Sequence, residues 1–162
     1  MDRDRDPQGR PRNARPRDAL GRPLPRDSDS GHETTAGEEI PDRLAPHDAV
    51  RLADRLLRDG RPFHAHEALE AAWKSAPSAE RDLWQGLAQI AVGITHARRG
   101  NARGAVTLLR RGIERTTRYQ GDTYGIDLGT VIRKANELAD RIQTDGTAAA
   151  AEPLTLISHT PE

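Results

Sequence analysis

The sequence predicts an all-α fold, a single antiparallel bundle of about five helices between residues 46 and 143, with a disordered tail on each side. Three observations support this prediction. Apolar residues in this region recur three and four positions apart, which is the spacing of one face of a helix. We find no alternating pattern typical of a β-strand. The links between the periodic segments are only a few residues long, and short links keep consecutive helices adjacent and antiparallel.

The two tails are predicted from their composition. All five aromatic residues lie between Phe63 and Tyr124, whereas seven of the eleven prolines lie in the first 46 residues. A segment with so little to bury cannot offset the entropy lost on ordering, so we expect residues 1–45 to be disordered. This tail is rich in arginine first and acidic afterwards. Residues 144–162 also lack aromatics and sustained periodicity, which predicts a second disordered tail.

The first helix is expected from about His47 to Gly60, because glycine commonly follows the last residue of a helix. The second is expected from Phe63 to Ser75. It ends before Pro77, since a proline disfavours the helical conformation in the residue before it.

Ser78 is expected to cap the third and longest helix, which ends at Gly100. This helix is apolar on more than one side, which predicts a central position in the bundle. Asn101 is expected to cap the fourth helix. After a loop at residues 119–126, Asp127 is expected to cap the fifth.

Several classes of protein are excluded by what the sequence lacks. No run approaches the roughly 20 consecutive apolar residues of a membrane span, and the first residues have no apolar region of a signal peptide. We therefore expect a cytoplasmic protein with no membrane partner. The absence of cysteine excludes disulfides, zinc–thiolate sites and thiol nucleophiles. With 25 basic and 25 acidic residues, the chain is not a globally basic nucleic-acid-binding protein, although charged blocks can cancel in this sum.

The most informative stretch lies in the second helix. A rotation of about 100° per residue places six side chains within an arc of roughly 120°, namely Phe63, His66, Glu67, Glu70, Trp73 and Lys74. A solvated face would separate its charges from its aromatics. The pattern therefore predicts either a partly buried polar pocket, or aromatics that pack while the charges reach past them to water. We expect the two tryptophans of the chain to pack in the core, because each ring buries a large area.

His66 and Glu70 stand four positions apart, so both can reach one divalent metal ion or each other. A metal site needs a further ligand, and His96 is the first candidate, on one stripe of the third helix with Gln85 and Gln89. If the second and third helices pack antiparallel, this stripe faces His66 and Glu70. The competing interpretation is a structural network in which the His–Glu pair, hydrogen-bonded to a glutamine, fixes the packing without binding anything.

The same residues carry a resemblance to a known family. His66, Glu70 and Trp73 fill an H-x-x-x-E-x-x-W motif, and together with three later segments they make the chain resemble the bacterial and archaeal proteins grouped as domain of unknown function 309. The later segments are residues 83–89, 99–105 and 125–128. The resemblance covers roughly residues 47–142. It implies an all-helical domain, with a motif suggested to bind metal and no established activity.

Two hypotheses of different classes follow. The first is a polar pocket that holds a divalent metal on His66, Glu70 and His96. As an enzyme it would carry out metal-assisted hydrolysis, with Glu67 as general base.

The second hypothesis is an interaction module that contacts RNA or an acidic protein partner. Four arginines give the fourth helix a basic face, and the arginine-rich tail adds a second contact. These arginines are Arg103, Arg110, Arg111 and Arg118. The competing interpretation is a solvated face, because no aromatics that would stack on bases are interleaved with them.

Overall fold

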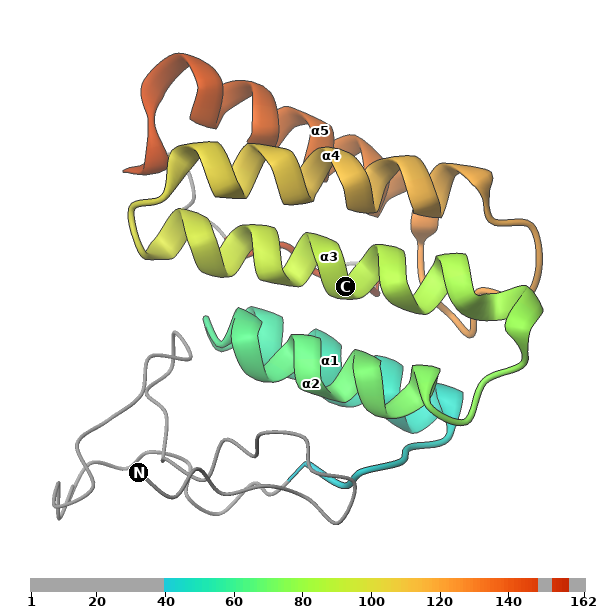
Figure 1. Cartoon of the computed structure of the whole chain (residues 1–162). Helices are drawn as coiled ribbons and strands as arrows, with labels where there is room; N and C mark the ends of the chain where they lie inside the picture. The colour runs from blue at the N-terminus through green and yellow to red at the C-terminus, as the bar shows by residue number, and fades with distance from the viewer. Residues whose placement is uncertain (1–39, 149–152, 158–162) are drawn as a thin grey trace, which may run out of the picture.

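The computed structural model describes residues 40–148 and 153–157. These residues contain helices and no strand, and consecutive α-helices run in opposite directions (Figure 1). The predicted all-α bundle of five helices is therefore confirmed. The predicted tail falls on residues 1–39 for most of its length, outside the described residues. In chain order the elements are α1 (Pro46–Arg58), α2 (Pro62–Trp73), the short 3₁₀ helix η1 (Ser78–Glu80), α3 (Arg81–Arg98), α4 (Ala102–Arg118) and α5 (Leu128–Asp145).

Two of the three predicted N-caps are confirmed. The side chain of Asn101 accepts a hydrogen bond from the Gly104 N–H at 3.0 Å, and that of Asp127 accepts one from the Thr130 N–H at 3.3 Å. The prediction for Ser78 was wrong, because Ser78 is the first residue of η1 and makes no capping bond for α3. The turn η1 intervenes between Pro77 and α3 and moves the start of α3 to Arg81.

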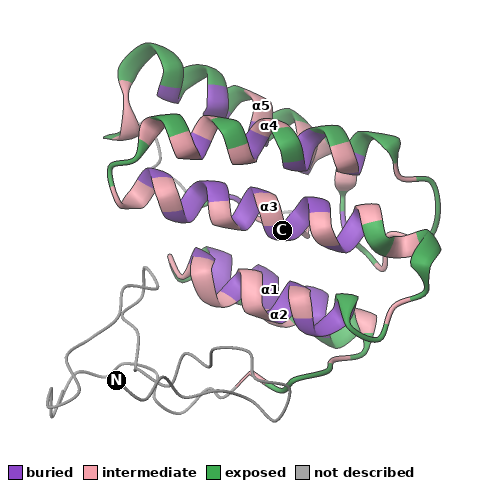
Figure 2. Ribbon diagram, in the orientation of Figure 1, coloured by how far each residue is buried: buried purple, intermediate pink, exposed green. Residues whose placement is uncertain are grey.

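Helix α3 lies at the centre of the bundle, as its sequence predicts. It packs against α2 on one side and α4 on the other, and buried residues occur on several of its sides (Figure 2). Helices α4 and α5 keep an exposed outer face. Trp84 of α3 is completely buried, which confirms the prediction for this tryptophan.

Glycines allow α3 and α4 to approach very closely. A Cβ atom on Gly112 of α4 would lie 2.5 Å from the carbonyl oxygen of Gly86 on α3. A Cβ atom on Gly86 would in turn lie 2.7 Å from Cγ2 of Thr116. Real side chains essentially never come so close, so this contact between backbones requires glycine at both positions.

The loop between α4 and α5 is anchored on the core by one carboxylate. Glu80 accepts a hydrogen bond from Nε1 of Trp84 at 3.1 Å and another from the hydroxyl of Tyr124 at 2.6 Å. The ring of Tyr124 stacks on Trp84 with its centroid 5.7 Å away. The hydrogen bond to the Glu80 carboxylate is the main reason why the pKa of Tyr124 rises to about 12.

The described part of the C-terminal segment differs from the predicted disordered tail. Leu154 and Leu156 are buried in the core. The carboxylate of Asp54 on α1, itself only 1% exposed, accepts hydrogen bonds from the backbone N–H groups of Leu156 at 2.8 Å and Ile157 at 3.1 Å. Residues 153–157, which we call the C-terminal strap, therefore belong to the domain. Helix α5 also ends at Asp145, two residues beyond the predicted boundary at residue 143.

Candidate functional site

A groove with a cavity of about 230 Å³ lies between α2, α3 and α4. It has apolar walls and a small number of polar groups. We call it the α2–α3 groove, because most of its lining comes from these two helices. The lining residues are His66, Glu70 and Trp73 from α2, Trp84, Gln85, Ala88, Gln89 and Val92 from α3, and Leu108 and Arg115 from α4.

The structure brings together five of the residues that the sequence singled out. They lie on the polar stripes that the sequence predicts for α2 and α3. These two helices pack antiparallel (Figure 1), and their polar stripes face each other across the groove. The five are His66, Glu70, Trp73, Gln85 and Gln89. Phe63, Glu67 and His96 do not line the groove. Phe63 instead packs beside the ring of His66, with the centroids 5.7 Å apart.

His66 and Glu70 form a direct pair on α2. Nε2 of His66 lies 2.9 Å from Oε1 of Glu70, and the side chains are 19% and 46% exposed. The hydrogen bond from His66 lowers the pKa of Glu70 below its usual value of 4.5, and the positive charge of Lys74 adds to this effect, while burial opposes it. Glu70 is therefore an ionised hydrogen-bond acceptor at neutral pH.

The residues present do not complete a metal site. In the described part of the chain, no three histidine, cysteine, aspartate or glutamate side chains lie close enough to hold one metal ion. His96, the expected third ligand, lies beyond Val92 in the last turn of α3, and its Nδ1 lies 3.0 Å from Nδ2 of Asn101. Glu67, the expected general base, also lies outside the groove.

Two buried polar atoms of the groove have no hydrogen-bond partner among the described residues. They are Nδ1 of His66 and Oε1 of Gln89. A carboxylate only accepts hydrogen bonds, so Nε2 of His66 carries the hydrogen that Glu70 accepts, and in the neutral ring Nδ1 is then an acceptor. The groove thus presents two unused acceptors, and the predicted hydrogen bond from a glutamine to the His–Glu pair is not formed.

Arg115 lines the groove although the sequence analysis did not single it out as a site residue. Its Nη1 donates hydrogen bonds to Oδ1 of Asp82 at 3.3 Å and to Oε1 of Gln85 at 2.9 Å. Only the register between α3 and α4 brings Arg115 to this position, and no local pattern reveals that register.

The exposure of Trp73 corrects the prediction that both tryptophans pack in the core. Trp73 is 37% exposed. No other large hydrophobic side chain in the described ranges 40–148 and 153–157 is exposed. It is the last residue of α2, so no further turn of this helix covers its ring. An accessible indole ring therefore stands beside Glu70 at the groove.

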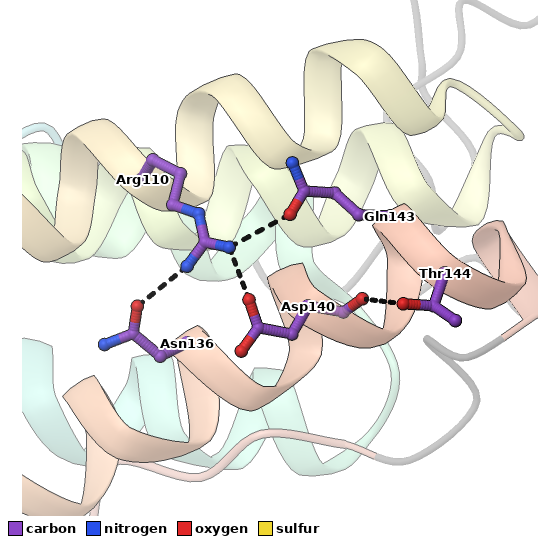
Figure 3. A network of polar contacts seen from close by, with 5 residues as sticks. All are labelled: Arg110, Asn136, Asp140, Gln143 and Thr144. Carbon is purple, nitrogen blue, oxygen red and sulfur yellow. Dashed lines mark hydrogen bonds and ion pairs between the residues drawn. The ribbon is translucent and has the colours of Figure 1, made fainter.

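The predicted basic face of α4 is partly used for contacts inside the domain. Arg110 donates hydrogen bonds to Asn136 at 2.9 Å, to Asp140 at 2.6 Å and to Gln143 at 3.1 Å, which ties α4 to α5 (Figure 3). Figure 3 also shows the hydroxyl of Thr144 hydrogen-bonded to the backbone oxygen of Asp140. Nη1 of Arg118 lies 3.9 Å from Oε1 of Glu114 on the same helix. The other two arginines, Arg103 and Arg111, are exposed and make no ion pair with described residues.

Comparison with known proteins identifies one family. Residues 50–108 match the family described as domain of unknown function (DUF309), which confirms the resemblance over this part of the chain. Over 85 residues the chain is 32% identical to the uncharacterized protein YpuF of Bacillus subtilis (strain 168), a stretch that covers 51% of this chain and 49% of the relative. The chain thus spans about half the length of this relative. No solved structure matches the chain. Among the described residues, no helix has both the length and the apolar character needed to cross a membrane.

Proposed function

We propose that this chain, which carries a domain of unknown function (DUF309) over residues 50–108, is a binding protein that holds a small ligand, or a single side chain of a partner, in the α2–α3 groove. The observation that supports this proposal is the pair of buried acceptors, His66 Nδ1 and Gln89 Oε1, that have no hydrogen-bond partner among the described residues. Most buried polar atoms in proteins are hydrogen-bonded, and a buried unpaired group costs about 1–3 kcal/mol. Proteins retain such costs where function requires them.

The shape and lining of the groove fit the same proposal. Ligand pockets are concave and mostly apolar, with a few placed polar groups. The cavity of about 230 Å³ is smaller than the 300–1,000 Å³ usual for such pockets, so it suits a small molecule or one side chain.

The proposal predicts that Gln89→Met stabilises the free protein. Methionine fills a similar space without a buried unpaired oxygen, so we expect the free energy of unfolding in urea to rise by about 1 kcal/mol. Gln85→Met is the matched control on the same helix. Its Oε1 accepts a hydrogen bond from Arg115, so its loss should lower the stability instead. A loss of stability in Gln89→Met would show that this amide serves folding and would contradict the proposal.

Binding itself is measured with acetamide, a small probe that donates and accepts hydrogen bonds. Titrated into the isotopically labelled full chain, acetamide should shift the NMR signals of the groove, including the indole N–H of Trp73. The shifts should be lost in Gln89→Met. Shifts scattered over the surface, or equal shifts in both proteins, would refute binding at the groove.

A divalent metal held by His66 and Glu70 is the competing proposal. Its support is the approach of two side chains of the types that bind zinc, and its weakness is the lack of a third ligand in the described residues. Zinc chloride titrated into dialysed protein distinguishes the two. Stoichiometric zinc that is lost in both His66→Ala and Glu70→Ala, but kept in Gln89→Met, would favour the metal.

An RNA or acidic protein partner is the second candidate function, favoured by Arg103 and Arg111 on α4, which are exposed and make no ion pair with a described residue. The arginine-rich segment that would assist them lies in residues outside the described ranges. Binding to a labelled single-stranded RNA at several salt concentrations tests it, with the double variant Arg103→Gln, Arg111→Gln in the full chain. Equal affinity of variant and wild type at low salt would exclude this face as the contact.

A further inference from the structure

We infer that the group held in the α2–α3 groove is a cation, either an ammonium or a guanidinium group. This inference rests on the proposed function and specifies the chemistry of its ligand. It follows from the hydrogen-bonding sense of the unpaired atoms, from the carboxylate of Glu70, which has no lysine or arginine in contact with it among the described residues, and from the exposed indole ring.

The unpaired atoms call for a ligand that donates hydrogen bonds. Oε1 of Gln89 is an acceptor, and Nδ1 of His66 is an acceptor in the neutral ring. The ionised carboxylate of Glu70 adds further acceptor positions, because one of its oxygens alone is taken by His66. An ammonium group brings three donors and a guanidinium group brings five, whereas an ionised carboxylate ligand brings none that can serve these atoms.

The charges in the groove favour a positive ligand as well. Arg115 is compensated by Asp82, whose Oδ1 lies 3.3 Å from its Nη1. Glu70 has only His66 as a partner and makes no ion pair with a lysine or arginine among the described residues. Lys74 lowers the pKa of Glu70 only from beyond ion-pair distance, so among the described residues the carboxylate of Glu70 has no lysine or arginine in contact with it.

Trp73 supplies a surface on which a cation can rest. Its ring is 37% exposed and lines the groove beside Glu70. Cations are attracted to the face of an indole ring, and a planar guanidinium group also stacks on it. A carboxylate, buried acceptors and an accessible indole thus converge on a cavity of about 230 Å³, which is the size of one small group.

The bound cation can come from two sources. One is a free small amine or guanidine, and the other is an arginine side chain of a polypeptide. This chain contains arginines that precede the domain, and the backbone N–H of Leu44 is hydrogen-bonded to the carbonyl of Ala71 at 3.2 Å, so the described residues that lead into α1 contact α2 near its C-terminal end. The nine arginines among residues 1–45 are Arg3, Arg5, Arg10, Arg12, Arg15, Arg17, Arg22, Arg26 and Arg43.

The test compares n-butylguanidinium and n-butylammonium with neutral n-butylurea, which has nearly the same shape as the guanidinium compound. NMR titrations of the full chain should give a dissociation constant for a cation that is lower than that of the urea by roughly tenfold, the effect of about one charge-assisted hydrogen bond. Glu70→Gln should abolish this difference and leave the binding of n-butylurea unchanged. Glu67→Gln, which removes the same charge from the same helix outside the groove, should leave the difference intact.

The outcomes separate this inference from the proposed function. Equal binding of the urea and the cations at the groove would overturn the cation while leaving a ligand groove in place, and no binding of any probe would overturn both. Changing all nine arginines of residues 1–45 to glutamine in the full chain distinguishes the sources. Tighter binding of n-butylguanidinium by that variant would identify the chain's own arginine as the occupant, and unchanged binding would identify an external cation.

Discussion

At the scale of single residues, the pair of His66 and Glu70 shows how one hydrogen bond decides the character of a site. The bond of 2.9 Å satisfies Nε2 of His66 and one oxygen of Glu70. It leaves Nδ1 on the other side of the ring without a partner. The pair thus fixes the tautomer of the ring and so determines which kind of ligand the buried nitrogen accepts.

The pair predicts a particular pH dependence. Because the hydrogen bond from His66 lowers the pKa of Glu70 below 4.5, the pair stabilises the fold above this pH, and the contribution is lost as the pH falls through the lowered pKa. NMR titration of the Glu70 carboxylate should show this low pKa directly. In His66→Ala the pKa should rise, since burial then acts without the hydrogen bond. An unchanged pKa in the variant would mean that His66 is not the cause.

At the scale of helices, the glycine contact between α3 and α4 determines how the groove is built. The register that places Gly112 against Gly86 also brings Arg115 and Leu108 of α4 to the groove. A wider separation of these helices would break the hydrogen bond of 2.9 Å that Nη1 of Arg115 donates to Oε1 of Gln85. The position of one wall therefore depends on residues that lie outside the site.

We predict that Gly112→Ala destabilises the protein, although alanine is the better helix former by about 1 kcal/mol. The new Cβ would lie 2.5 Å from a backbone oxygen, which cannot move aside as a side chain can. Overpacking of this kind typically costs about 1–3 kcal/mol, measured as a lower free energy of unfolding in urea. Gly129→Ala in α5 is the control, because nothing lies within 4 Å of its Cβ, and it should leave the protein equally or more stable. A stable Gly112→Ala would show that the helices can separate freely.

The features that the sequence could predict are local, and those that it could not predict depend on how the helices pack. The caps at Asn101 and Asp127 and the pairing of His66 with Glu70 are local, so three or four residues of sequence determine them. The tertiary features could not be predicted in this way. The place of Arg115 depends on the α3–α4 register, and Ser78 fails as a cap because η1 intervenes before α3.

At the scale of the whole molecule, the C-terminal strap joins the first helix to the start of the last. The N–H groups of Leu156 and Ile157 reach Asp54 on α1, while the carbonyl of Leu156 accepts from the N–H of Asp127, the cap of α5. Composition alone predicted disorder here, because two buried leucines in a short segment give no periodic signal. The strap is thus a part of the core that only the folded domain reveals.

We expect Asp54→Ala to be strongly destabilising. It leaves two backbone N–H groups and Arg58, whose Nε lies 3.1 Å from Oδ2, without their buried acceptor. Removal of one partner from such a buried charged network costs about 3–5 kcal/mol, to be measured by urea denaturation. Asp48→Ala, which breaks the exposed pair with Arg51, should change the stability by less than about 1 kcal/mol. Similar effects of the two substitutions would show that the strap contributes little.

The bond between Asp54 and Leu156 also has a kinetic consequence, because it joins residues 102 positions apart. The helical pairs α1–α2, α2–α3 and α3–α4 form from contacts that are near in sequence, and such contacts form early in folding. We therefore expect docking of the strap to follow them and its interactions to be absent from the transition state. Interactions formed so late slow unfolding without speeding folding. We therefore expect the five residues of the strap to slow unfolding and so to lengthen the lifetime of the native state.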